Sequence, residues 1–205
     1  MRRFHNVLTA SAVALLVGFV LATISAQPLD KRTFFTFSAP VKLPGLTLPP
    51  GKYLFRVADP ETGGRVVQVL SADGKTLYGT FFAIPAERLD PAPAPEVRFI
   101  ETPAGTPPAI KEWWNQGELI GREFIYPRQE AMLLAKSSSR PVLTTKSNTT
   151  TVEQTKNADL SRLSPNGQET NVNANDKPQA SAPTGATQVG EVAPITIVIV
   201  AAPRR

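Results

Sequence analysis

The sequence contains no cysteine, and its only histidine, His5, lies in an N-terminal segment that we expect to be removed. A chain without these residues has no thiol nucleophile and no Ser-His-Asp triad. It also has no thiolate or imidazole ligands for zinc, haem, copper or iron–sulfur clusters. We therefore predict that the protein is not an enzyme and that it carries no cofactor and no metal.

The sequence also lacks any segment in which charge of one sign is concentrated. Residues 27–136 hold 13 Lys and Arg against 12 Asp and Glu, and residues 137–205 hold 7 against 5. Nucleic-acid binding needs a basic patch or stripe. The formal net charge of +5 is therefore typical of an ordinary solvated surface, and we predict no nucleic-acid partner.

The N-terminus has the three parts of a secretory signal. Arg2 and Arg3 are followed by an apolar run over residues 7–24, and Ser25-Ala26 offers a small residue for cleavage. We predict that residues 1–26 are a signal peptide and that the product is periplasmic, surface-bound or secreted. The run of about 18 residues is close to the length that spans a bilayer, so an uncleaved membrane anchor is the alternative.

Aromatic residues are missing from the chain after Tyr126. Beyond residue 26 they begin at Phe34 and end at Tyr126. Because a packed core needs large apolar side chains, we expect one domain over residues 27–136. Residues 137–191 are rich in Ser, Thr, Asn, Gln, Pro and Ala and have no apolar period, so we predict a disordered polar linker there.

Short runs of alternating apolar residues, separated by turn signals, are typical of a mainly β fold. Asp73-Gly74 predicts a tight hairpin between two of the runs, residues 110–114 fit a strand or a helical turn, and residues 128–136 predict a short helix. The expected strands occupy residues 33–38, 52–57, 65–70, 76–84, 97–101 and 123–126. This spacing favours a small antiparallel β-sandwich or barrel over a parallel α/β sheet.

The stretch from Leu48 to Phe55 (LPPGKYLF) resembles the strand opening of transthyretin-like and other immunoglobulin-like modules of secreted bacterial proteins. More broadly, the hairpin, Ala83-Ile84-Pro85 and the EFIYP run from Glu123 to Pro127 resemble a group of uncharacterised secreted bacterial β-domain proteins. The resemblance implies an immunoglobulin-like or transthyretin-like sandwich. It implies no activity and no catalytic residues.

The C-terminal segment, residues 192–205, contains the most β-prone window of the chain, from Ile195 to Val200. The window is uncharged and too short to cross a membrane as a helix, and it is an aggregation hazard if exposed. We expect Ile195, Ile197, Val198 and Ile199 to pair with a sheet. The acceptor is the domain itself, an envelope protein or a second copy of the chain.

The tryptophan pair in Trp113-Trp114-Asn115-Gln116-Gly117 is the main candidate ligand site. Aromatics followed by amides can form a platform on which sugars stack, so Trp113, Trp114, Asn115 and Gln116 are candidate glycan-binding residues. Because adjacent strand residues face opposite ways, at most one tryptophan is expected to be exposed. The structural alternative is that one fills the core and the other covers its edge.

Carboxylates offer two remoter alternatives. Glu112, Glu118 and Glu123 lie near the tryptophans, and a glycosidase needs two carboxylates in a cleft. The acidic loop residues Asp59, Glu61 and Asp73 do not match the spacing of a calcium-binding loop.

The interpretation we favour is an exported, non-enzymatic β-sandwich module with a structural or binding role in the cell envelope, with carbohydrate binding as the main alternative. Membrane contact is expected only through an uncleaved N-terminal segment.

Overall fold

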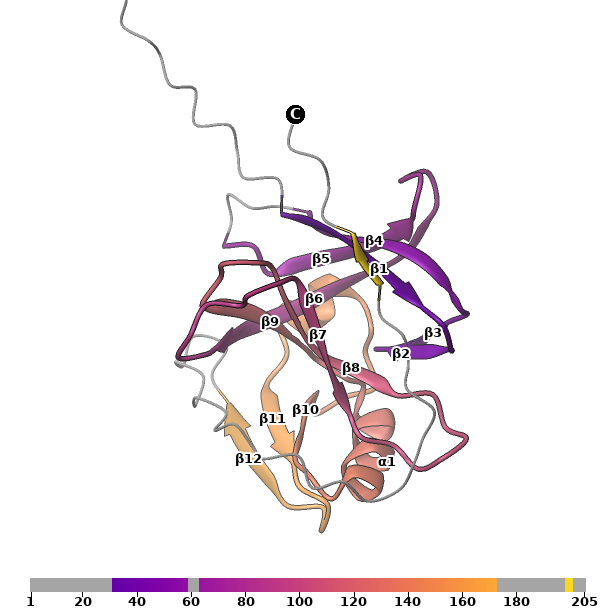
Figure 1. Cartoon of the computed structure of the whole chain (residues 1–205). Helices are drawn as coiled ribbons and strands as arrows, with labels where there is room; N and C mark the ends of the chain where they lie inside the picture. The colour runs from indigo at the N-terminus through magenta and orange to yellow at the C-terminus, as the bar shows by residue number, and fades with distance from the viewer. Residues whose placement is uncertain (1–30, 59–62, 173–197, 201–205) are drawn as a thin grey trace, which may run out of the picture.

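A computed structural model describes residues 31–58, 63–172 and 198–200, and in these residues the chain is mainly β with two helices (Figure 1). The signal segment expected at residues 1–26 lies outside the described residues, as do Asp59 and Glu61. The helices are α1 (Arg128–Ser138) and α2 (Val152–Lys156). The strands are β1 (Arg32–Phe37), β2 (Val41–Leu43), β3 (Leu46–Leu48), β4 (Gly51–Val57), β5 (Val66–Ser71), β6 (Leu77–Glu87), β7 (Glu96–Ile100), β8 (Ala109–Trp114), β9 (Ile120–Phe124), β10 (Val142–Thr145), β11 (Leu160–Leu163), β12 (Glu169–Val172) and β13 (Val198–Val200).

Ten of the described strands form one sheet that folds over on itself. Its order is β13-β1-β4-β5-β6-β9-β8-β2-β3, with β7 also paired to β8. The long strand β6 joins the halves, because residues 77–82 pair with β5 and residues 83–87 pair with β9. We call β13, β1, β4, β5 and the first half of β6 the first layer. The second layer is the rest of β6 with β9, β8, β7, β2 and β3.

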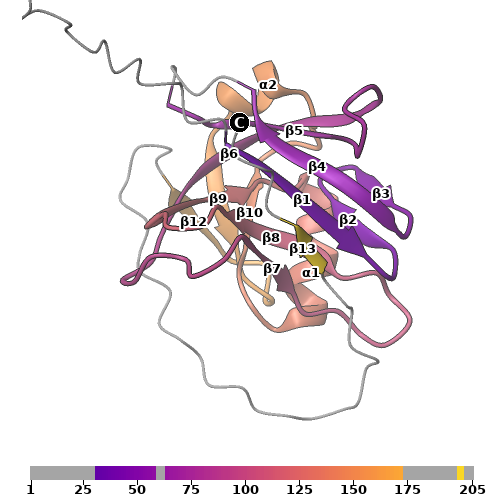
Figure 2. The same cartoon turned by 45° about the horizontal axis from the view of Figure 1, so that its top comes forward.

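The two layers enclose an aromatic core. Phe55 of the first layer meets Trp113 of the second with ring centroids 5.9 Å apart, and Phe81 meets Phe124 at the same distance. Both pairs have the edge-to-face geometry that aromatic rings prefer. Figure 2 shows the first-layer strands β1 and β4 crossing in front of the second layer. The antiparallel β-sandwich predicted from the sequence is therefore confirmed.

Several local predictions are also confirmed. Asp73-Gly74 forms the turn between β5 and β6, where Gly74 has a φ of +74°, a value that an L side chain rarely adopts. Residues 110–114 belong to strand β8 rather than to a helical turn. Helix α1 begins at Arg128 as expected and ends at Ser138.

The prediction of a disordered linker from residue 137 is wrong as far as residue 172. Strands β10, β11 and β12 form a second sheet, which we call the small sheet. It packs on the outer face of β6, with α1 beside it (Figure 1). A second apolar cluster joins this sheet to the sandwich through Phe82, Ile84, Ile125, Leu143 and Leu160. The domain therefore extends at least to Val172, while residues 173–191 lie outside the described residues.

The same segment completes helix α1. Pro127 occupies the N-cap position and gives no side-chain cap. Instead, the Arg128 and Gln129 backbone N–H groups donate to the Ser147 carbonyl (3.1 Å) and to Asn148 Oδ1 (2.9 Å). Since the first N–H groups of a helix have no partner within it, the segment after α1 satisfies donors that the sandwich alone would leave open.

Candidate functional site

The tryptophan pair lies near the end of β8, and the two rings face opposite sides of the second layer. Trp113 belongs to the sandwich core, whereas Trp114 belongs to a separate small cluster with Ala86 and Ala92. The expected alternation is therefore present. The glycan platform is not, because both tryptophans are 0% exposed. Neither ring offers a face on which a sugar could stack.

Trp113 is covered from the first layer and from its own sheet. Phe55 meets it edge to face, and the Arg122 guanidinium lies 5.2 Å from its ring centroid. Arg122 is fixed there by donating to the Gly64 carbonyl at 3.0 Å. The Trp113 Nε1 is buried and has no hydrogen-bond partner among the described residues.

A polar network closes the sandwich beside Arg122. Arg122 pairs with Glu118 at 3.1 Å, and Lys31 pairs with the same carboxylate at 2.6 Å. Burial raises the pKa of Glu118, but the hydrogen bond from Lys31 and the charge of Arg122 outweigh it, so the pKa lies below its usual value. Asn115 belongs to this network, because it accepts from Thr33 Oγ1 and donates to Glu118.

Trp114 is covered from the other side by charged side chains. Its ring rests on Gly121, where an added Cβ would come within 2.4 Å of the indole. The guanidinium groups of Arg88 and Arg98 lie 5.2 and 5.3 Å from the ring centroid. Trp114 Nε1 donates to Glu112 at 3.2 Å. Trp114 therefore reaches full burial through cation–π contacts and one hydrogen bond rather than through an apolar core.

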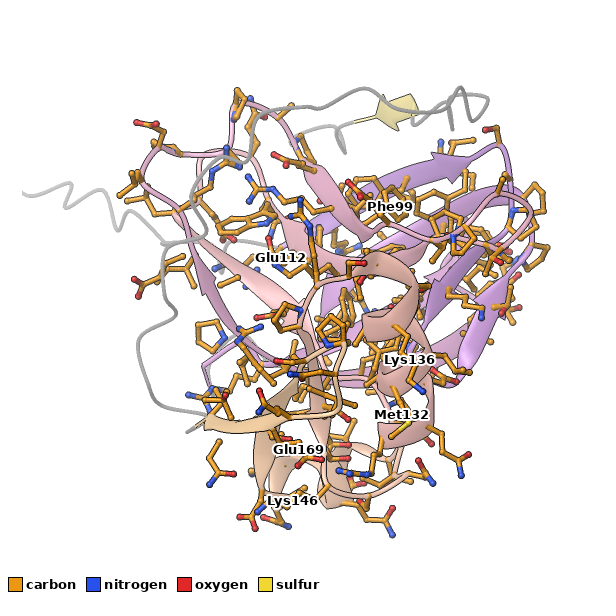
Figure 3. All side chains as sticks on the ribbon, turned by 90° about the horizontal axis from the view of Figure 1, so that it is seen from below. Phe99, Glu112, Met132, Lys136, Lys146 and Glu169 are labelled. Atoms are coloured by element: carbon orange, nitrogen blue, oxygen red, sulfur yellow. The ribbon has the colours of Figure 1, made fainter. Side chains whose placement is uncertain are left out.

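These residues belong to a larger set that we call the outer charged cluster: Arg88, Glu96, Arg98, Lys111, Glu112, Glu123 and Arg162. Arg98 links Glu96 (2.7 Å) to Glu112 (3.5 Å), and Lys111 also pairs with Glu112 (2.7 Å). Arg162 of the small sheet binds both Glu123 oxygens, at 2.8 and 2.6 Å. Figure 3 shows Glu112 surrounded by other side chains.

The cluster favours the charged forms of Arg162 and Glu96. Hydrogen bonding to Glu123 raises the pKa of Arg162 despite burial, and the charge of Glu112 adds to the effect. Burial raises the pKa of Glu96, but hydrogen bonds from Arg98 and Arg88 outweigh it, so the net shift is downward. The salt bridges of the cluster join β7 to β8 through Arg98 and Glu112, and join β9 to the small sheet through Glu123 and Arg162.

The carboxylates considered for a glycosidase are placed in two groups. Glu112 and Glu123 lie directly opposite each other on β8 and β9, whereas Glu118 belongs to the network on the other side of the layer. Glu112 and Glu123 are therefore neighbours across the sheet. A substrate cannot reach them, because their side chains are 3% and 4% exposed and each is engaged by cations. This geometry gives the glycosidase alternative no support.

Gln116 lies in a pair of loops that are joined by hydrogen bonds. Its Nε2 donates to the Pro93 carbonyl at 3.2 Å, and the Gly117 N–H donates to Ala92 at 2.8 Å. In return, the Ala92 N–H donates to Glu118 at 3.1 Å. Residues 88–95 and 115–119 thus form one surface element over the outer charged cluster.

This element exposes large apolar side chains. Leu89 is 82% exposed, Leu119 is 47% exposed and Ile120 is 54% exposed. They lie on neighbouring backbone positions, because the Arg88 N–H donates to the Leu119 carbonyl and Glu87 is paired with Ile120. We call Leu89, Leu119 and Ile120 the loop surface. Sequence reasoning missed it, although Leu89 within a Pro/Ala-rich connection and Leu119 after Asn-Gln-Gly-Glu were signals of exposed apolar residues.

The C-terminal window provides the edge strand of the first layer. Val198 and Ile199 pair antiparallel with Thr36 and Phe35 of β1, and Val200 continues the pairing. The expected pairing of Val198 and Ile199 is therefore present, with the domain itself as acceptor. Ile195 and Ile197 lie outside the described residues.

Two other kinds of site are absent from the part of the chain that the structure describes. The described residues contain no helix long and apolar enough to cross a membrane. They contain no group of three or more His, Cys, Asp and Glu side chains arranged to hold a metal ion. The Asp73 carboxylate accepts hydrogen bonds from the Ser71 hydroxyl and the Lys75 N–H, so it stabilises the turn between β5 and β6.

Comparison with protein-family models, with curated proteins and with solved structures gives no match.

Proposed function

We propose that the chain is an exported, non-enzymatic β-sandwich module that binds another protein of the cell envelope through the loop surface. The export part of the proposal is supported by the sequence pattern of residues 1–26. The binding part is supported by one observation, the exposure of Leu89, Leu119 and Ile120 on neighbouring backbone positions. Large apolar side chains that are exposed close together along the backbone are candidates for a protein interaction site.

The way the loops are held supports a binding role. The hydrogen bonds between residues 88–95 and 115–119 fix the backbone that carries the loop surface. Beneath it, Trp114 is clamped between Gly121 and two arginines. A surface that is already ordered before binding loses less conformational entropy when its partner docks. The arginines that hold Trp114 and the hydrogen bonds between the loops thus both stabilise the backbone that carries the loop surface.

The proposal predicts a specific contact in living cells. A photo-crosslinking amino acid at Leu119 should give one defined crosslinked product in the envelope fraction of the bacterium that makes this protein. The matched control is the same amino acid at Leu133, which is 70% exposed on α1 and lies outside the loop surface. The variant Leu89→Ser/Ile120→Ser should remove the product while the melting temperature stays close to that of the unmodified chain.

Two results would overturn the proposal. One is a crosslinking pattern at Leu119 that matches the pattern at Leu133. The other is a protein that fractionates with the cytoplasm, with residues 1–26 still attached.

A further inference from the structure

Strand β13 ends the ten-stranded sheet. It pairs with β1 on one side, and among the described residues no strand lies on its other side. An edge strand presents a row of backbone N–H and C=O groups that can pair with another strand. Proteins usually protect such an edge with charges, proline, a bulge or a covering segment.

Within residues 192–202 the sequence offers no charged protection, and Pro203, Arg204 and Arg205 follow this stretch. Residues 192–202 contain no Asp, Glu, Lys or Arg, and Val198, Ile199 and Val200 are all β-branched. Such a strand has high β propensity, and its pairing with a copy of itself brings no like charges together over this stretch. The edge is therefore suited to a second copy of the same chain.

We propose that β13 is a homodimer interface, in which β13 of one copy pairs antiparallel with β13 of a second copy around a twofold axis at Ile199. An antiparallel pair of identical strands is self-complementary, as a twofold-symmetric interface requires. Residues of an antiparallel ladder alternate between hydrogen-bonded and non-hydrogen-bonded pairs. A twofold axis at Ile199 places Ile199 opposite Ile199 of the second copy and Val198 opposite Val200 of the second copy. This arrangement is symmetric whether the Ile199 pair is hydrogen-bonded or non-hydrogen-bonded.

The register with β1 identifies two positions of β13 for a test. Val198 and Val200 lie opposite Thr36 and Phe34, which are half-buried, whereas Ile199 lies opposite the fully buried Phe35. The variant Val198→Lys/Val200→Lys adds charge to the edge strand at the two positions that do not lie opposite Phe35. In the dimer it would also place each lysine opposite a lysine of the other copy, which is destabilising.

The first test is sedimentation equilibrium of the chain from residue 27 over a concentration series. Because the paired strands are short, we expect a reversible dimer that dissociates on dilution. The Val198→Lys/Val200→Lys variant should be monomeric at concentrations where the original chain is dimeric. Leu133→Lys, on the exposed face of α1, should leave the dimer unchanged. The melting temperature of each variant as a monomer checks that the fold is intact.

The second test uses the absence of native cysteine. Opposed residues of an antiparallel pair have Cα atoms close enough for a disulfide. Mixed and oxidised, Val198→Cys and Val200→Cys chains should form a disulfide-linked heterodimer, and either variant alone should form little. A monomer at every concentration, a dimer that survives the double lysine variant, or equal crosslinking in the unmixed samples would overturn the proposal.

These outcomes are separate from those of the proposed envelope contact. The loop surface and β13 lie on different elements, so Leu89→Ser/Ile120→Ser should leave the dimer intact. A dimer lost in that variant and kept in Val198→Lys/Val200→Lys would assign self-association to the loop surface and overturn the role of β13.

Discussion

Residues 31–138 and residues 139–172 reach burial with different side chains. The first region holds every described aromatic residue and encloses a core of phenylalanine, tyrosine and tryptophan. The second has no aromatic residue, yet its strands bury Leu143 and Leu160 together with the polar Thr144 and Ser161. Aromatic content therefore marks where the largest side chains lie, but not where the domain ends. Short strands with few apolar residues can extend a core when their leucines pack against an apolar face of a neighbouring sheet.

The largest expected effect comes from removing the second region. A chain of residues 27–138 should show no cooperative thermal unfolding, because Phe82, Ile84 and Ile125 lose their apolar cover and Glu123 loses Arg162. A chain of residues 27–172 retains every one of these contacts and is the control. Circular dichroism during heating measures both. A sharp transition in the shorter chain would show that the first region folds alone.

A pair of glycine substitutions compares packing in the two regions. Gly121→Ala should destabilise the fold by about 1–3 kcal/mol, because the new methyl group collides with the clamped Trp114 ring. Gly167→Ala, in the turn before β12, has open space and meets only the strain of its positive φ, so a smaller loss of about 1 kcal/mol is expected. Urea unfolding midpoints measure both losses. Equal losses would contradict the close packing around Trp114.

Acid should weaken the first region through Glu118. The pKa of Glu118 is lowered in the folded protein, so its contribution is fully present above the ordinary glutamate pKa of 4.5. The contribution is then lost as the pH falls through the lower folded value. Glu118→Gln should reduce stability at neutral pH and make its decline below pH 4.5 shallower. The Glu153→Gln variant, on the exposed surface of α2, is the control. A parallel pH profile for Glu118→Gln would contradict the assigned role.

The smallest expected effect concerns the polar link between the regions. Asn148→Ala removes the side-chain oxygen that accepts from the Gln129 N–H, and losing a helix N-terminal acceptor costs about 1 kcal/mol. Thermal unfolding should detect the loss, whereas Asn157→Ala, at the exposed end of α2, should change little. An unchanged melting temperature for Asn148→Ala would show that water replaces this acceptor at no cost.

The sequence predicted local structure well where the chemistry is local. Asp73-Gly74 needs a left-handed backbone for its turn, and alternating apolar residues must place one face inward, so the hairpin and the sandwich followed from the pattern. The predicted end of the domain was wrong because the segment after Lys136 is rich in polar residues, which the sequence pattern does not distinguish from a linker. The buried Thr144 of this segment is satisfied by the Tyr126 carbonyl, 18 residues earlier in the chain.

The amino-acid sequence by itself determined the β class, the opposite facing of Trp113 and Trp114, and the lack of thiol and imidazole chemistry beyond His5. Only the tertiary structure decided that both tryptophans are buried, because their covers come from Phe55, Arg88 and Arg98, on other strands and loops. Only the tertiary structure placed Leu89 beside Leu119 and set Val198–Val200 at the sheet edge. Contacts between residues far apart in sequence depend on how the strands pair, and the pattern of a single strand does not specify its neighbours.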